Sequence, residues 1–173
     1  MVKRIAVAVT LALLCSAVAA STAVSARRVA LTSLEAGVLV RVNEIRAQHG
    51  LVPLRLSAGL TEAATEHSEQ MALDGFFDHA SADGTAFWKR IGHWYAPGGR
   101  GLWSVGENLL WSSPRVGPGA ALRVWMGSPE HRANILSAKW REIGVSSVHV
   151  ARAPGFFGGR EVTIITTDFG VRR

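Results

Sequence analysis

The chain has 173 residues, 48% of them hydrophobic, and a formal net charge of +6. Its single cysteine, Cys15, lies within the first 26 residues, which excludes a disulfide, a thiol nucleophile and a cysteine zinc site from the remainder of the chain. The basic residues form no stripe interleaved with aromatic residues, so the composition argues against a nucleic-acid-binding protein.

Residues 1–26 have the pattern of a secretion signal: a positively charged start, an apolar segment over 5–14 and small residues over 17–26. The apolar segment is shorter than the roughly 20 residues that a membrane-spanning helix needs. Cleavage after Ala20 or after Ala26 fits the pattern, and an uncleaved anchor is the less favoured alternative. We therefore expect a protein that is secreted or held in the cell envelope, with no transmembrane segment after cleavage.

The chain beyond the signal is long enough for one domain with its own core. Removal of 1–26 takes away Lys3 and Arg4 and no acidic residue, so the net charge falls from +6 to +4. A moderately basic exported surface suits an anionic envelope component as partner. The expected division is a signal peptide over 1–26, a short segment over 27–34 and one domain over 35–170.

Local patterns predict two long helices in the first half of the domain. Thr32 and Glu35 have the spacing of a capping box, and the apolar residues that follow at helical spacing predict a helix over 33–49. Ser57 is expected to cap a second helix that ends at Gly75.

Shorter elements are expected in the second half. A third helix opens at 84–85, a fourth at Pro118 and a fifth at Ser128 and Pro129, where the serine can cap and the proline suits the first turn. Two strands are expected over 142–150 and 160–169, joined by a Pro/Gly-rich hairpin loop. The chain has no internal repeat and no linker that would divide it into two domains.

His67 lies on the apolar face of the predicted second helix. The favoured interpretation is a buried histidine that is hydrogen-bonded to a neighbour, because buried polar groups are normally satisfied within the protein. A metal ligand is the alternative.

Four tryptophans occur between residues 88 and 111. Trp88 and Trp111 are expected to pack beneath a loop. Trp94 and Trp103 flank the glycine-rich segment 97–101 and are expected to form an exposed rim for an apolar or sugar ligand.

Three polar residues are candidates for a single site. His79 follows two phenylalanines in a loop, Glu107 stands between apolar residues, and His131 falls in the first turn of the fifth helix. A carboxylate in apolar surroundings must be paired, hydrogen-bonded or bound to a cation, so a structural salt bridge is the alternative for Glu107. Glu130 either complements the helix dipole, which we favour, or reaches the same site as a second carboxylate. Asn134 is expected to brace local backbone.

Several motifs in fixed order resemble one family. They are Val40–Arg46 with Val52–Leu54, Phe77–His79, Gly106–Asn108, Ser128–Leu136, Glu142–Val145 and Thr167–Gly170. Together they are similar to the bacterial branch of the CAP superfamily, which comprises cysteine-rich secretory proteins, antigen 5 and pathogenesis-related 1 and is also called the SCP domain. The resemblance covers residues 35–170.

The resemblance implies an α+β fold, a three-layer α–β–α sandwich with a small antiparallel sheet between helices. In the family, a cleft on one face carries two histidines and two glutamates, and some members are reported to bind metal there. Position by position, the motifs match His79 to the first histidine, Glu107 to one glutamate and His131 to the histidine of the bacterial Ser-Pro-x-His-Arg helix. The eukaryotic histidine of the last strand has no counterpart here, since its place near 164–167 holds no histidine.

Two imidazoles and one carboxylate suit zinc with a water in the open position. His79, Glu107 and His131 are therefore the candidate metal ligands and zinc the candidate cofactor, while no catalytic residue is assigned. The favoured function is a secreted CAP/SCP protein whose cleft binds a cation, a lipid-like ligand or an envelope-derived ligand. The alternatives are a metal-dependent hydrolase that uses the same three residues and a structural envelope protein. The chain contains no Gly-x-Ser-x-Gly nucleophile motif.

Overall fold

The computed structural model describes residues 29–99 and 101–173. The predicted signal peptide over 1–26 lies outside these residues. Within the described part of the chain, every helix is too short or too polar to cross a membrane.

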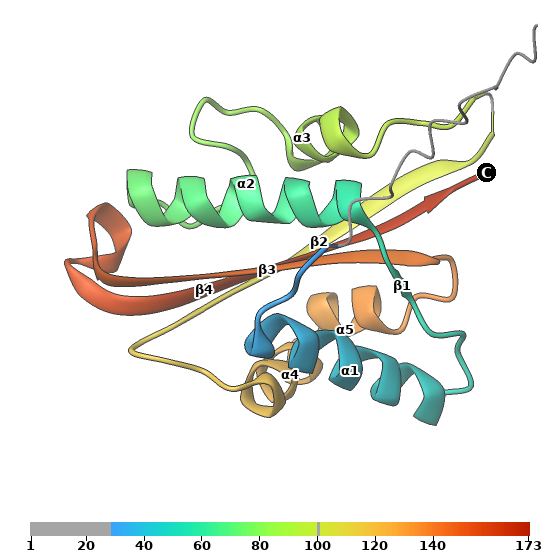
Figure 1. Cartoon of the computed structure of the whole chain (residues 1–173), viewed down its shortest axis with the longest axis horizontal. Helices are drawn as coiled ribbons and strands as arrows, with labels where there is room; N and C mark the ends of the chain where they lie inside the picture. Colours follow the sequence, from blue (N-terminus) through green and yellow to red (C-terminus); the bar gives the residue numbers. More distant parts are fainter. Residues whose placement is uncertain (1–28, 100) are drawn as a thin grey trace, which may run out of the picture.

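A four-stranded sheet lies between two layers of helices (Figure 1). Helices α2 and α3 cover one face, and α1, α4 and α5 cover the other, which confirms the α–β–α sandwich. The helices are α1 (Ser33–Gln48), α2 (Ala58–Asp74), α3 (Phe87–Trp94), α4 (Pro118–Gly127) and α5 (Pro129–Ile135). The strands are β1 (Arg55–Leu56), β2 (Trp103–Ser112), β3 (Glu142–Ala153) and β4 (Arg160–Arg172), with the 3-10 helix η1 (Gly155–Phe157) between β3 and β4.

The strand order is β1-β3-β4-β2, so β2 forms one edge of the sheet. Strand β4 pairs antiparallel with β3, as expected for the predicted hairpin, and also with β2, a strand that the sequence analysis did not predict. The expected antiparallel pairing holds for the three long strands, whereas strand β1 pairs parallel with β3 through Arg55 and Glu142, so the sheet is mixed. The reason is that β1 belongs to no hairpin: it lies where the chain passes from α1 on one face to α2 on the other.

Most of the predicted helix ends are confirmed. Thr32 and Glu35 form a complete capping box, with the Thr32 amide donating to Glu35 Oε2 at 2.7 Å. Ser57 accepts a backbone N–H of the first turn of α2, and Gly75 ends that helix with φ at 70°. Ser128 occupies the N-cap position of α5, but its hydroxyl makes no capping hydrogen bond.

The two faces of the sheet are packed differently because successive strand residues point to opposite sides. On the α1/α4 side, Ile165, Phe169 and Val171 of β4 join one large apolar cluster that includes Trp125 of α4. On the α2/α3 side, the apolar residues form two smaller clusters. Buried polar side chains are also found on this side: His67, Ser68, Arg90, Glu107, Thr166 and Asp168.

Two of the four tryptophans, Trp88 and Trp103, differ from the expectation in their exposure. Trp111 packs against the phenylalanines of η1, and Trp94 is 42% exposed, as expected. Trp88 is 47% exposed rather than packed, because the residues two and three positions later occupy the inward face of α3. Trp103 is half-buried and donates its indole N–H to the Tyr95 carbonyl at 2.8 Å, so it forms no exposed rim.

Candidate functional site

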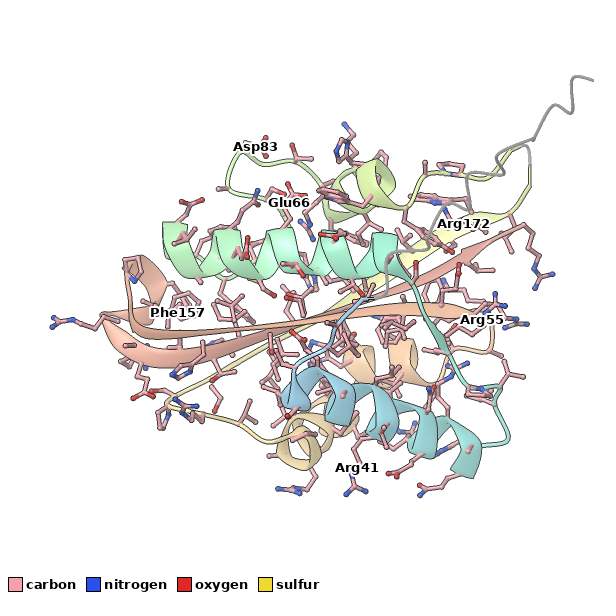
Figure 2. The ribbon with its side chains drawn as sticks, viewed as in Figure 1. Arg41, Arg55, Glu66, Asp83, Phe157 and Arg172 are labelled. Atoms are coloured by element: carbon pink, nitrogen blue, oxygen red, sulfur yellow. The ribbon has the colours of Figure 1, made fainter. Side chains whose placement is uncertain are left out.

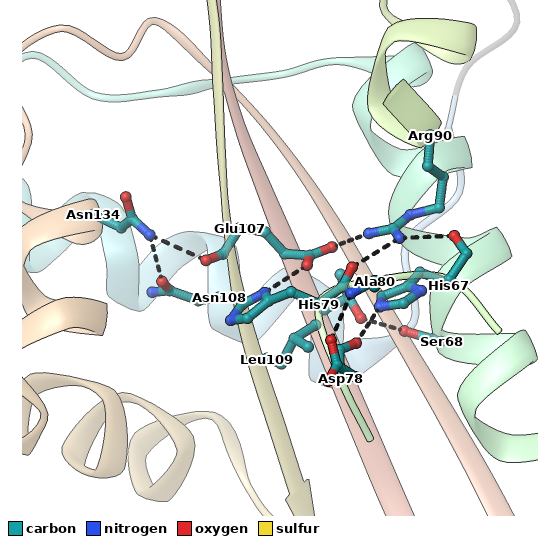
Figure 3. A network of polar contacts seen from close by, with 12 residues as sticks. His67, Ser68, Asp78, His79, Ala80, Arg90, Glu107, Asn108, Leu109 and Asn134 are labelled. Carbon is teal, nitrogen blue, oxygen red and sulfur yellow. Dashed lines mark hydrogen bonds and ion pairs between the residues drawn. The ribbon is translucent and has the colours of Figure 1, made fainter. Parts of the chain in front are cut away.

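The centre of the site is the carboxylate of Glu107, which is 4% exposed on β2. His79 Nδ1 lies 2.7 Å from Glu107 Oε1, and the guanidinium of Arg90 pairs with Glu107 Oε2 (Figure 3). Each oxygen of this carboxylate is therefore engaged by a different side chain. The salt-bridge alternative for Glu107 is confirmed, with Arg90 as the partner.

Arg90 also holds the loop that carries His79. Its Nη1 donates to the His79 carbonyl at 3.1 Å and to Ser81 Oγ at 3.2 Å. Because Arg90 comes from α3 and Glu107 from β2, the ion pair fixes the loop to both elements. Arg90 was missed in the sequence analysis, since its local pattern is indistinguishable from that of the neighbouring Lys89.

His67 of α2 contacts the backbone of the same loop. It is fully buried on α2, and its Nε2 lies 2.8 Å from the Asp78 carbonyl. Burial lowers the pKa of His67, which favours the neutral imidazole. The favoured interpretation of a buried histidine hydrogen-bonded to a neighbour is confirmed, although among the described residues its Nδ1 is buried without a partner.

Asp168 is a second buried carboxyl beside Glu107. It is the cross-strand partner of Glu107 in the β2–β4 pair and is fully buried, and among the described residues neither of its oxygens has a hydrogen-bond partner. Burial, followed by the negative charge of Glu107, raises the pKa of Asp168 well above its ordinary value. The sequence analysis missed this residue, although the argument applied to Glu107, an acid among strand residues, would have found it.

The edge strand β2 separates His79 from the helix that carries His131. Asn108 Nδ2 donates to the His131 carbonyl at 3.1 Å, and Asn134 Nδ2 donates to the Glu107 carbonyl at 3.0 Å and to Asn108 Oδ1 at 2.9 Å. These bonds attach α5 to the side of β2 opposite α2 and α3. Asn134 was expected to brace local backbone; it does brace backbone, but that of β2, which lies far from it in the sequence.

The two site histidines have opposite pKa shifts. The hydrogen bond to Glu107 raises the pKa of His79, against a smaller opposing effect of burial. Burial and then the charge of His79 lower the pKa of His131, while the charge of Glu130 opposes them. The site therefore favours an imidazolium at His79 and a neutral imidazole at His131. Glu130 itself is exposed in the first turn of α5, a position that complements the helix dipole.

The three candidate ligands are brought together only in part. His79 and Glu107 are in contact, whereas His131 approaches from the other side of β2. Across residues 29–99 and 101–173, no three His, Cys, Asp or Glu side chains converge in a metal-binding arrangement. Among the described residues, Nδ1 of His131 is buried without a hydrogen-bond partner, as is Nδ1 of His67, and the 2.7 Å contact of His79 with Glu107 uses Nδ1 and leaves Nε2 of that ring.

A sequence profile of the cysteine-rich secretory protein family, CAP, matches residues 39–158, more than half of the chain. The chain belongs to the CAP family. The matched region contains His79, Glu107 and His131 and ends at Gly158, directly after η1.

Two curated proteins of Bacillus subtilis are similar in sequence to this CAP chain. The uncharacterized protein YkwD is 31% identical over 120 residues, which is 68% of this chain and 43% of YkwD. The uncharacterized membrane protein YlbC is 30% identical over 114 residues, which is 66% of this chain and 31% of YlbC. The matched region thus spans less than half the length of either relative.

Solved structures share the fold at lower sequence identity. An outer surface protein of Borrelia burgdorferi has a TM-score of 0.62 at 19% identity, over 78% of this chain and 90% of that one. An extracellular protein of Bacillus anthracis that contains an SCP domain has a TM-score of 0.60 at 23% identity, over 84% and 45%. A cysteine-rich secretory protein of Staphylococcus aureus has a TM-score of 0.57 at 18% identity, over 79% and 38%.

Proposed function

We propose that this CAP domain binds a divalent cation such as zinc at the edge of β2, between the imidazoles of His79 and His131. The observation that carries the proposal is the 2.7 Å contact between His79 Nδ1 and Glu107 Oε1. A carboxylate that holds one ring nitrogen fixes the tautomer and orientation of the imidazole and leaves the other nitrogen free to bind a metal. In His79, that nitrogen is Nε2.

The state of His131 supports the proposal. Metal binding requires a neutral imidazole, and the lowered pKa of His131 favours that form. At His79, whose pKa is raised, the metal must displace the Nε2 proton, so zinc binding at this site should weaken as the pH falls. The buried Nδ1 of His131 also has no hydrogen-bond partner among the described residues, which leaves an imidazole nitrogen unsatisfied.

Glu107 has a different role in this proposal from the one the sequence suggested. Because His79 and Arg90 engage its two oxygens, Glu107 orients His79 and is not itself a ligand. The same contacts hold both oxygens of the 4% exposed carboxylate toward His79 and Arg90, so Glu107 is poorly placed to reach an attacking water, and the geometry favours cation binding over the hydrolase alternative.

The protein is proposed to act outside the cytoplasm, at the cell envelope. The secretion pattern over residues 1–26 supports this, as do structural neighbours described as an outer surface protein and an extracellular protein. An envelope-derived or lipid-like ligand at the same cleft is part of the proposal. Such a ligand would change tryptophan fluorescence on titration, and a panel of lipids without effect would argue against it.

Zinc binding is tested by thermal unfolding of the metal-free protein with and without added zinc. At zinc about 100 times above its Kd, mass action adds about 2.7 kcal/mol, which is about 5–10 °C in Tm for a domain of this size. His79→Ala and His131→Ala should each remove most of this gain. His93→Ala, at an exposed histidine of α3, is the matched control and should keep it. Identical unfolding curves with and without zinc would refute the proposal.

A further inference from the structure

Basic side chains gather at one end of the sheet, where β4 ends and β1 and β3 begin. We call this surface the basic end, and it consists of Arg55, Lys139, Arg141, Arg172 and Arg173. Arg141 is half-buried and the other four are exposed. Figure 2 shows Arg55 and Arg172 together at this end of the molecule. The five residues come from three separate segments of the chain, so no local pattern in the sequence reveals the cluster.

Backbone hydrogen bonds join these segments. The Arg55 amide donates to the Arg141 carbonyl at 3.0 Å, and the Arg141 amide donates to the Gly170 carbonyl at 3.0 Å. At the end of β4, the Arg173 amide donates to the Leu102 carbonyl at 2.9 Å. The basic side chains are therefore carried by neighbouring backbone segments, and the sheet holds them together.

The positive charges of the basic end are poorly compensated. Its Glu142 lies 3.9 Å from Arg172 Nε and accepts the hydroxyl of Tyr95. Among the described residues, the other four basic side chains form no ion pair. Glu142 is also the only acidic side chain in the described residues of four surrounding segments: 49–57, 95–104, 136–144 and 170–173. The net charge of the basic end is therefore +4, or +3 with the backbone carboxylate of Arg173 counted.

Acidic residues of the adjoining helices serve other contacts. Glu44 of α1 pairs with Arg41 at 2.9 Å. Glu62 of α2 lines a hollow on the outer face of that helix, together with Trp94. The basic end thus presents a surface of one sign, which is complementary to an anionic partner.

Two exposed apolar side chains stand among these charges. Val52, in the segment before β1, is 52% exposed, and Leu102, directly before β2, is 51% exposed. The buried Arg46 fixes the position of Val52, because its guanidinium donates to the Val52 carbonyl at 3.0 Å. The same guanidinium donates to the Ser137 carbonyl at 3.0 Å, in the turn that carries Lys139.

The combination of cations with exposed apolar residues favours a lipid surface over a soluble polyanion. A polyanion can neutralise the cations but does not remove an apolar side chain from water. At a bilayer, the apolar side chains enter the boundary of the acyl chains while arginine and lysine remain at the depth of the lipid phosphates.

We propose that the basic end docks the protein on an anionic lipid bilayer. Val52 and Leu102 enter the interface, and the basic side chains around them bind lipid phosphates. The proposal does not depend on a metal at the edge of β2, since none of His79, Glu107 and His131 belongs to the basic end.

The test measures cosedimentation of the purified exported protein with vesicles that contain phosphatidylglycerol and phosphatidylcholine, and with vesicles of phosphatidylcholine alone. Binding to the anionic vesicles is expected at about 50 mM NaCl and should weaken at about 300 mM NaCl, because salt screens the attraction. A triple variant that combines Arg55→Gln, Lys139→Gln and Arg173→Gln should weaken this binding about 100-fold, or about fivefold for each charge removed.

The matched control removes three exposed cations from other surfaces. It combines Arg41→Gln, Arg123→Gln and Arg152→Gln, at exposed positions of α1, α4 and the far half of β3. Its net charge equals that of the first triple variant, and it should bind anionic vesicles within about threefold of the parent. Equal binding by the two triple variants would show that overall charge, not the basic end, attracts the vesicles, and would overturn the proposal.

Two single variants test the lipid contact. Leu102→Ser should weaken vesicle binding about fivefold, because half of this side chain is exposed and available for insertion. Polyphosphate is the soluble polyanion used for comparison, and Leu102→Ser should not change its binding. His79→Ala should bind vesicles like the parent even if it no longer binds zinc.

Three further results would overturn the proposal. They are equal binding to anionic and neutral vesicles, vesicle binding by Leu102→Ser that matches the parent, and loss of vesicle binding in His79→Ala. The second result, together with tight binding of polyphosphate, would identify a soluble polyanion as the partner instead.

Discussion

The α1/α4 side of the sheet is packed by one continuous apolar cluster, and the buried Arg46 of α1 donates there to backbone carbonyls. The α2/α3 side divides its apolar residues into two clusters and buries the ion pair of Arg90 with Glu107 between them and the sheet. The first arrangement yields stability mainly from apolar burial. The second requires a partner for each buried charge and is costly wherever one is missing. We therefore expect the α1/α4 layer to supply most of the stability and the α2/α3 layer to hold the polar groups of the site. Three experiments test this division.

The largest effect is expected in the apolar layer. Trp125 is fully buried and also donates its indole N–H to the Leu109 carbonyl at 2.9 Å. Trp125→Ala should lower the free energy of unfolding by about 4 kcal/mol, through lost burial and a cavity that cannot fully collapse. Urea unfolding measures the change. Trp88→Ala, at an exposed position, is the control and should stay within about 0.5 kcal/mol. A loss at Trp125 no larger than at Trp88 would contradict the role given to this layer.

A somewhat smaller loss in the free energy of unfolding is expected when one partner of the buried ion pair in the α2/α3 layer is removed. Arg90 and Glu107 have side chains only 2% and 1% exposed, so Arg90→Met removes the buried cation and leaves the carboxylate with the partly exposed His79 as its partner. The free energy of unfolding should fall by about 3 kcal/mol. Adding Glu107→Gln removes that charge and should recover more than half of the loss.

The matched control for the buried pair is the exposed pair of Arg41 with Glu44 on α1. Arg41→Met should change the free energy of unfolding by less than about 0.5 kcal/mol, since solvent screens an exposed pair. If the double variant at Arg90 and Glu107 were as unstable as Arg90→Met alone, unpaired charge would not be the cause of the loss.

The smallest expected effect is an increase in the free energy of unfolding. The raised pKa of Asp168 means that the folded protein holds this proton more tightly than the unfolded chain does. Its contribution to stability is therefore complete below the unfolded pKa of about 3.9 and is lost as the pH rises through the folded pKa. Asp168→Asn, which cannot ionise, should be more stable than the parent by about 1 kcal/mol at pH 8 and by less at pH 5.

The exposed Asp74 provides the comparison for this pH effect. Asp74→Asn should change the free energy of unfolding by the same small amount at both pH values. A gain at Asp168 that did not grow with pH would show that the buried carboxyl is not the group that titrates.

Elements set by neighbouring residues were predictable from the sequence. The capping box of Thr32 and Glu35, the end of α2 at Gly75 and the two long strands β3 and β4 depend on local hydrogen bonds and periodicity. The hydrogen-bonded role of His67 followed from its position on an apolar helical face.

Features set by distant contacts were not predictable in the same way. The parallel pairing of β1 depends on the route of the chain around the sheet, and the exposure of Trp88 depends on which face of a short helix turns inward. Arg90 acquires its role only when α3 is placed against β2, which no local pattern reveals. At the site, the sequence indicated the residues His79 and Glu107, but not that the carboxylate would be shared with an arginine.

The β2 edge of the sheet is closed to a further strand over its central part. The outward carbonyls of Glu107 and Leu109 on β2 already accept hydrogen bonds from Asn134 and Trp125. A strand from another molecule would have to displace these side chains before it could add to the sheet at β2. The β2 edge is thereby protected from edge-to-edge aggregation at high local concentration, whereas on the opposite side β1 covers only Glu142 and Ile143 of the twelve-residue strand β3.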